Sequence, residues 1–203
     1  MEKAATLGID LNTKDNNGLT GFDQVCQRFD QDLVKMFFEN ATKLSFDLNG
    51  KDNMGWTAFH SACELGFPDV VKSFMDNATA LRIDLNITNN DGMTAFLIAC
   101  QNGHADVVKN FMENPFTLGI DLNVKDINGK TAFHWACQFG HTGVVNNFME
   151  NAVNLSIDLN SKDKSGSTGF QWACQMLKTD VANILKKNAA NLCIDLNKYV
   201  KFE

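Results

Sequence analysis

The stretch that decides the fold is residues 125–160, which opens with Lys125-Asp-Ile-Asn-Gly129-Lys-Thr131-Ala-Phe-His134-Trp-Ala-Cys137-Gln-Phe-Gly140-His141 and closes with Leu155-Ser-Ile-Asp-Leu-Asn160. Its pattern recurs with a period of 37 residues and without insertions, as the turn glycines show: Gly18, Gly55, Gly92, Gly129 and Gly166. A threonine follows each of these glycines after two residues, and a cysteine follows after eight. Five copies of a short unit at constant period indicate a solenoid, in which each unit buries its apolar face only against its neighbours.

One run of residues resembles a known repeat family. Asp126-x-x-Gly129-x-Thr131-Ala-Phe-His134-x-Ala136-Cys-x-x-Gly140-His141-x-x-Val144-Val145-x-x-Phe148-Met149 is similar to the ankyrin repeat, with its turn, two antiparallel helices and T-P-L-H-x-A core. The resemblance covers about nine tenths of the chain and implies an all-α solenoid of stacked helix-turn-helix units with hairpin-like finger loops. The chain departs from the family pattern in its period, which exceeds the usual length of about 33. It also lacks the usual proline, which is replaced by Ala58, Ala95, Ala132, Gly21 and Gly169.

We expect a single domain, because an array of repeats has no ordinary domain boundary. The predicted units are residues 1–13 as a partial repeat or N-terminal cap, 14–50, 51–87, 88–124 and 125–161 as repeats one to four, and 162–203 as repeat five with a C-terminal cap. Leu7-Gly-Ile-Asp-Leu-Asn12 is identical to residues 118–123, so we expect either a fragment of a longer array or a shortened cap. The first and last repeats have lost parts of the pattern and should fray first.

Local signals place two helices in each regular repeat. Thr57 and its equivalents are predicted to cap the first helix, because a hydroxyl there can accept from the open amides of the first turn. Gly66 and its equivalents are predicted to end that helix in a left-handed conformation. Pro115 should end or kink the second helix of repeat three early. The second helix is otherwise expected to gain one turn over the family norm, with the apolar stripe Val70, Val71, Phe74, Met75, Ala78 and Leu81.

The connection between repeats has its own pattern. An Ile-Asp-Leu-Asn segment leads in most copies into a Lys-Asp-x-x-Gly turn. Alternating apolar residues before such a turn predict a two-stranded, hairpin-like finger, and neighbouring fingers should lie side by side as a narrow ribbon. Ankyrin repeats as a family are hydroxylated at an asparagine similar to the one that ends this segment, although the usual upstream leucine is absent here. The asparagines concerned are Asn49, Asn86, Asn123 and Asn160.

Composition and charge argue against several function classes. The formal net charge is -6 and no basic run is longer than Lys186-Lys187, so we expect no nucleic-acid partner. No apolar stretch approaches the roughly 18 to 20 residues that span a bilayer, so we expect no membrane partner. Five of the six cysteines recur at one repeat position, and stacked helices lie too far apart for disulfides to join them. Unpaired thiols favour a reducing, cytoplasmic location, and we expect a monomer.

The four histidines are candidates for metal binding or catalysis. His60 and His134 occupy the histidine position of the repeat core, and His104 and His141 open the second helix. Members of each pair lie whole repeats apart, and no Cys-x-x-Cys or His-x-x-x-His motif accompanies them. Nucleotide-binding and hydrolase motifs are also absent from the sequence. We therefore expect structural histidines, no enzyme, no catalytic residue, no metal site and no cofactor.

Positions that differ between copies indicate the binding surface, because all copies share the same folding demands. These positions lie at the finger tip and on the surface of the first helix, which line the concave side of an ankyrin-like stack. Their mixture of aromatic, methionine and polar residues is typical of interface hot spots. The predicted partner-binding residues are Asn53, Met54, Trp56, Leu65, Asn90, Asp91, Met93, Asn102, Asn128, Lys130, Trp135 and Phe139.

Two functions remain open at this point. The first is a non-enzymatic protein-protein interaction module that binds a protein partner on this concave surface. The second is a structural spacer within a longer array, without a specific ligand of its own. Trp135 and the equivalent Trp172 are compatible with both functions, since the residue after the core histidine is often a half-buried packing residue.

Overall fold

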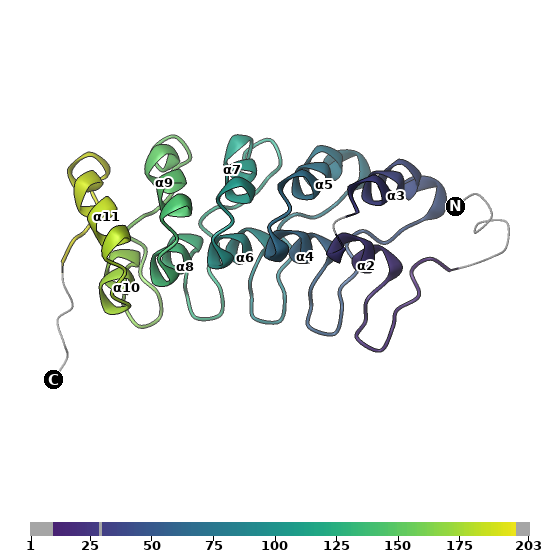
Figure 1. Cartoon of the computed structure of the whole chain (residues 1–203), viewed down its shortest axis with the longest axis horizontal. Helices are drawn as coiled ribbons and strands as arrows, with labels where there is room; N and C mark the ends of the chain where they lie inside the picture. The colour runs from purple at the N-terminus through teal and green to yellow at the C-terminus, as the bar shows by residue number, and fades with distance from the viewer. Residues whose placement is uncertain (1–9, 29, 198–203) are drawn as a thin grey trace.

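The computed structural model describes residues 10–28 and 30–197, which form ten helices in five consecutive pairs (Figure 1). The first helices of the pairs are α2 (Gly21–Gln27), α4 (Ala58–Leu65), α6 (Ala95–Asn102), α8 (Ala132–Phe139) and α10 (Gly169–Gln175). The second helices are α3 (Gln31–Leu44), α5 (Pro68–Leu81), α7 (Ala105–Glu113), α9 (Thr142–Asn151) and α11 (Thr179–Leu192). Residues 1–9 of the predicted N-terminal unit and residues 198–203 of the predicted C-terminal cap lie outside the described part of the chain.

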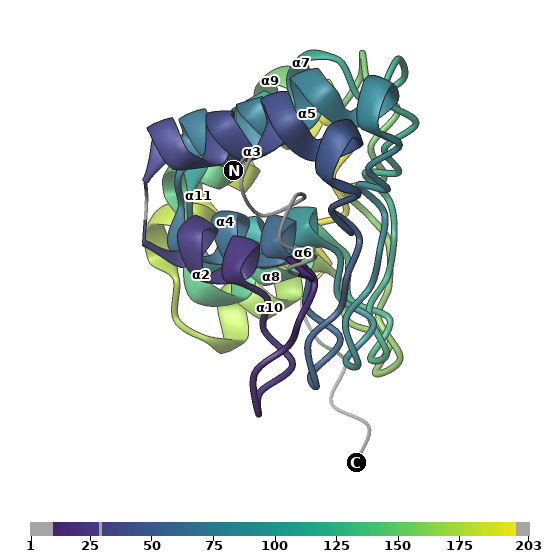
Figure 2. The same cartoon turned by 90° about the vertical axis from the view of Figure 1, so that its right-hand side faces the viewer.

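The helices form two layers, with the first helices in one row and the second helices in the other (Figure 1). The loops that join one pair to the next, here called fingers, extend beyond the row of first helices on one side (Figure 2). Within the described residues the fingers contain no strand, and the one bridge between their arms joins Thr88 to Thr94. The predicted all-α solenoid is confirmed. The fingers lie side by side as predicted, but they consist of turns instead of strand pairs.

A column of buried phenylalanine rings fills the space between the two layers. Phe59 of α4 contacts Phe74 of its own repeat, with ring centroids 5.2 Å apart, and Phe111 of the next repeat at 5.7 Å. Phe96 continues the column in the same way, 5.1 Å from Phe111 and 6.3 Å from Phe148. Because Phe59 and Phe96 each pack against rings of two repeats, the core runs without a break from one repeat to the next.

The recurrent cysteines fill the same core. Cys26, Cys63, Cys100 and Cys137 are buried, and Cys174 is half-buried; none forms a disulfide. Burial raises the pKa of the four buried thiols well above the usual value, so that they stay protonated. They act as small apolar residues of the core.

The first helices begin and end as their local signals predict. The hydroxyl of Thr57 accepts from the His60 amide, and His60 Nδ1 accepts from the Thr57 amide, so two open donors at the helix start are satisfied. Gly66 ends α4 with a φ of 72°, and a Cβ atom there would collide with the His104 ring of the next repeat. Glycine at this position therefore serves both the chain reversal and the stacking of the next repeat.

The second helices differ in length. α3, α5 and α11 contain 14 residues, whereas α7 contains 9 and α9 contains 10. The early end of α7 before Pro115 was predicted and is confirmed. The short α9 was not predicted. Its chain continues as turns in which Leu155 still donates to Asn151.

An asparagine ladder joins each finger to the next repeat. Asn49 Nδ2 donates to the carbonyl of Arg82 at 3.0 Å, and Asn49 Oδ1 accepts from the Asp84 amide at 2.9 Å. Arg82 is the residue with left-handed φ that ends α5, so the ladder satisfies backbone groups that the helix leaves open. Asn12, Asn86, Asn123 and Asn160 make the equivalent two bonds.

The ladder explains each residue of the Ile-Asp-Leu-Asn segment. In the second copy, Ile83 and Leu85 are buried in the core, whereas Asp84 accepts from the Asn86 amide at 2.9 Å and so fixes the turn that aims the asparagine. The two apolar residues of the segment therefore pack in the core, and its aspartate positions the asparagine that bonds to the next repeat.

Asn86→Ala should lower the free energy of unfolding by about 1 to 2 kcal/mol, because it removes two hydrogen bonds to the next repeat. Asn102→Ala is the matched control, since Asn102 Nδ2 donates only to Ile98 of its own helix. The control should change stability by less than about 0.5 kcal/mol. Urea unfolding of both variants measures the difference, and equal losses would contradict the role of the ladder.

Hydrogen exchange resolved by repeat should show the strongest protection in repeats two to four, where neighbours cover both sides of the core. The short α7 should not open first, because Val107, Val108, Phe111 and Met112 remain buried within it. Earliest exchange in residues 107–112 would contradict this account.

Candidate functional site

The finger tips are closed by an aspartate or asparagine at the start of each turn. Asp52 Oδ1 accepts from the amides of Met54 and Trp56, each at 2.8 Å. A single backbone bond then links one tip to the next, as where the Asn90 amide donates to the Met54 carbonyl at 3.1 Å. The tips are therefore fixed both within each finger and between fingers.

Five predicted partner-binding residues lie exposed at these tips. Met54 is 63% exposed, and Asn53, Asn90, Asp91 and Asn128 are also exposed. Asn53 Nδ2 donates to the Asn16 carbonyl at 2.9 Å, and Asn90 Nδ2 donates to the Asn53 carbonyl at 3.3 Å. The tip asparagines thus hold neighbouring fingers together, while Met54 has its side chain in solvent.

Two other predicted residues, Met93 and Lys130, are buried at the finger base, where they are 7% and 8% exposed. Met93 lies in the core, and its carbonyl is bonded to His60 Nε2 at 3.2 Å. The structure therefore places these two residues beneath the finger surface, where they support it.

Lys130 joins repeats four and five through two indole rings. Its ammonium lies 4.6 Å from the Trp135 ring centroid and 3.7 Å from the Trp172 ring centroid, and it donates to Gln138 Oε1 at 2.6 Å. Burial lowers the pKa of Lys130, and the nearby carboxylate of Asp163 acts in the opposite direction. The cation is thus held between two π faces and an amide oxygen.

The indole N–H groups of this cluster are also bonded. Trp135 Nε1 donates to Asp126 Oδ2 at 3.2 Å, and Trp172 Nε1 donates to Asp163 Oδ2 at 2.8 Å. Both aspartates belong to finger turns, so each tryptophan ties a first helix to its own finger. These bonds fit a packing role for both tryptophans, which the sequence left open beside partner binding.

Phe139 extends the cluster toward solvent. Its ring stacks on Trp135, with centroids 5.9 Å apart and planes 10° apart, and on His141 at 6.0 Å. Phe139 is 44% exposed, whereas Trp135 is half-buried. Trp135 is therefore held in place by its neighbours, and the Phe139 ring is partly exposed to solvent.

Phe139 belongs to a row at the ends of the first helices. Its equivalents are Leu65, Asn102 and Met176, all of them exposed. Met176 and its neighbour Leu177, which is 82% exposed, were not among the predicted residues. The offset of 37 from Phe139 identifies Met176, but repeat five has lost the Gly-His pair that marks this position elsewhere.

Trp56 lies apart from the repeat-four cluster, on the finger of repeat two. It is half-buried beside His60, with ring centroids 5.9 Å apart. Its indole N–H is buried and has no hydrogen-bond acceptor within the described residues. The predicted residues thus form two groups: Met54 and Trp56 at one finger, and the aromatic cluster around Phe139.

All four histidines bridge neighbouring repeats. His60 and His134 accept a backbone N–H at Nδ1, so their proton lies on Nε2 and is donated to a carbonyl of the next repeat. The acceptors are the carbonyls of Met93 for His60, Ser167 for His134, Glu64 for His104 and Gln101 for His141, at 2.7 to 3.2 Å. The described residues contain no group of three potential ligands that could hold a metal ion.

The comparisons with known proteins agree with this geometry. A family model of ankyrin repeats in three copies matches residues 78–156 and 115–198, and a model of the single ankyrin repeat matches residues 54–90. The chain belongs to the ankyrin repeat family, whose members are generally non-enzymatic protein-protein interaction modules. None of the curated proteins compared with the chain matches it. Within residues 10–28 and 30–197, no helix combines the length and apolar character needed to cross a membrane.

The buried histidines make stability depend on pH. Burial lowers the pKa of His60 to about 4, against the opposing effect of its bond to the Met93 carbonyl, and burial also lowers the pKa of His134. Between about pH 6.5 and pH 4 the unfolded chain therefore binds protons that the folded chain does not. The free energy of unfolding should fall as the pH is lowered through this window.

His60→Gln should remove part of that loss, at most on the order of 3 kcal/mol, because glutamine does not titrate. The cap should survive, since Gln171 fills the same position in repeat five and accepts from the Thr168 amide at 2.9 Å. Urea unfolding of the variant and the parent at pH 7 and pH 4.5 tests this. Equal losses of stability in both proteins would contradict the assignment to His60.

Proposed function

We propose that the chain is a non-enzymatic protein-protein interaction module whose partner binds the fingers and the exposed surface of the first helices. The observation that supports this most directly is the set of exposed apolar side chains among the predicted residues, Met54, Leu65 and Phe139, within a polar surface. Exposed apolar side chains within a polar surface mark an interaction site more often than a catalytic one. The proposed partner is another protein.

The rigidity of this surface also supports the proposal. Met54 lies on a finger that is bonded to both neighbouring fingers, and Phe139 is stacked on a tryptophan that is tied to its own finger. Side chains that are already ordered lose little conformational entropy when a partner binds. Lys130 and Met93 contribute in this proposal by holding the finger bases in place.

The proposal includes no catalytic residue, metal or cofactor, and no nucleic-acid or membrane partner. The four histidine rings already have backbone partners. The net charge of -6 opposes binding to a phosphate backbone. A cytoplasmic monomer remains part of the proposal, supported by cysteines without disulfides.

The second candidate is a structural spacer in a longer array. The asparagine ladder favours it, because the same two bonds recur at every joint from Asn12 to Asn160 and give a uniform chain of repeats. A spacer does not need exposed apolar residues on one surface, whereas a binding module does. The two candidates therefore differ in their response to surface substitutions.

The variant Met54→Ala/Trp56→Ala/Phe139→Ala should lose its protein partners, with affinity about tenfold or more below that of the parent. The control is Phe116→Ala/Val153→Ala, which removes exposed apolar side chains away from the finger tips and the first helices. Proteins captured from a cell extract by each immobilised chain are compared by mass spectrometry, after circular dichroism shows that all three are folded. Equal capture by the triple variant and the parent would move the site elsewhere, and no specific capture by the parent would favour the spacer.

A further inference from the structure

A second surface feature borders the proposed site. The short turns between the first and second helices form one edge of the molecule, at the ends of the first helices that point away from the fingers (Figure 2). We call this the turn edge, comprising residues 28, 30–33, 64–69, 101–106, 138–143 and 175–180. Its most exposed apolar residues are Phe139, Met176 and Leu177 in repeats four and five, and single leucines, Leu33 and Leu65, lie on repeats one and two.

Acidic residues dominate the rest of this edge. Exposed carboxylates are Asp30, Asp32, Glu64, Asp69, Asp106 and Asp180, against the two cations Arg28 and Lys178. Most of these acids lie at the start of a second helix, where the helix dipole favours negative charge. The turn edge therefore carries a net negative charge, concentrated on repeats one to three.

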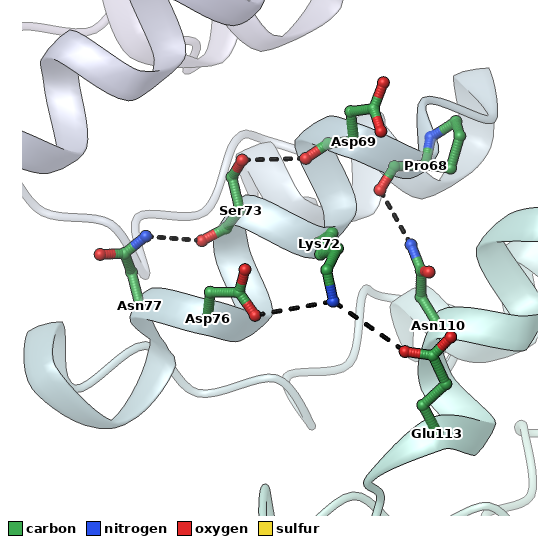
Figure 3. A network of polar contacts seen from close by, with 8 residues as sticks. All are labelled: Pro68, Asp69, Lys72, Ser73, Asp76, Asn77, Asn110 and Glu113. Carbon is green, nitrogen blue, oxygen red and sulfur yellow. Dashed lines mark hydrogen bonds and ion pairs between the residues drawn. The ribbon is translucent and has the colours of Figure 1, made fainter.

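The edge acids have no ion-pair partner within the described residues. The ion pairs of that part of the chain join Lys72 to Asp76 and to Glu113, at 3.9 Å each, on the outer surface of the second helices. Figure 3 shows Lys72 turned toward these two acids, while the Asp69 carboxylate points away from them. Lys72 therefore does not neutralise the negative charge of Asp69 at the start of α5.

The charge and the large apolar side chains are distributed unevenly along the edge. Repeat four has Gly143 where repeat three has Asp106, and it carries the exposed Phe139 ring instead. Repeat five adds Met176 and Leu177, and its one acid, Asp180, lies beside Lys178. A partner that matches this edge needs apolar anchors at one end and positive charge at the other.

The spacing of the anchors selects the form of that partner. Stacked helices lie about 8 to 10 Å apart, so Phe139 and Met176, at equivalent positions of neighbouring repeats, should be separated by roughly this distance. Side chains seven residues apart on a helix are about 10.5 Å apart and on the same face. On one face of an extended strand the available spacings are about 6.6 and 13 Å, which fit less well.

We propose that the turn edge binds a basic amphipathic helix of a protein partner, which lies along the array. Its apolar residues, seven positions apart, contact Phe139 and Met176, and its lysines or arginines lie over Asp69 and Asp106. This inference rests on the proposed function, because the turn edge borders the proposed binding surface and the inference states the chemistry of the partner that binds there. An acidic segment would be repelled by the carboxylates of repeats one to three. An extended peptide would place its apolar side chains at spacings that do not match the distance between neighbouring repeats.

The test uses the full chain and a displayed library of random peptides of roughly 25 residues, long enough to span about 38 Å as helices. Enriched peptides should be basic, become helical on binding and carry apolar residues at seven-residue spacing. Asp69→Lys/Asp106→Lys should weaken their binding about tenfold at low salt, with a smaller effect at about 0.5 M salt, where charges are screened. Phe139→Ala should weaken binding about tenfold at both salt concentrations.

Glu39→Lys/Glu150→Lys is the matched control for charge, since both acids are exposed on second helices and lie outside the turn edge. It should leave the affinity within about twofold of the parent. Enriched peptides without a basic bias, or equal losses in the two lysine variants, would overturn the proposal. Peptides that depend only on Met54 and Trp56 would overturn it while the proposed function stands. A library without any binder would also overturn it, and the capture experiment above then decides the proposed function separately.

Discussion

At each joint, the residue with left-handed φ just before the Ile-Asp-Leu-Asn segment and the aspartate of that segment each offer one backbone group, and the asparagine of the preceding finger bonds to both. For Asn49 these groups are the Arg82 carbonyl and the Asp84 amide. The bonds require an asparagine at one fixed position in every copy, one repeat before its acceptor. Because phenylalanine rings such as Phe59 also contact two repeats, polar bonding and core packing impose the same period. Both sets of contacts therefore favour a constant repeat length.

The candidate surface depends on this regular frame and departs from it at a few positions. Lys130 replaces an apolar residue at the finger base, and the two tryptophans around it compensate for its burial. The same cluster fixes Trp135 and leaves Phe139 partly exposed. Variation between copies thus has two physical meanings here. Some variable positions are exposed and available to a partner, whereas others hold neighbouring repeats together.

Charged and apolar residues are distributed unevenly along the array, so its two ends present different surfaces. All repeats share one backbone plan, yet acids gather on the turn edge of repeats one to three, and large apolar side chains gather on repeats four and five. A repeat fold can present such a gradient because each surface residue is supported by its own and adjacent repeats only. Membership of the ankyrin family explains the frame but not this distribution.

The sequence by itself determined the period, the threonine caps, the glycine ends of the first helices and the early end before Pro115, because these depend on local backbone chemistry. Only the tertiary structure decided which variable residues reach solvent. Met93 and Lys130 share the repeat position of Trp56, yet they are buried while Trp56 is half-buried, since burial there depends on the side chains of the next repeat. The exposure of Met176 and Leu177 and the early end of α9 were likewise seen only in the structure, because the period of the repeat does not encode the packing around individual side chains.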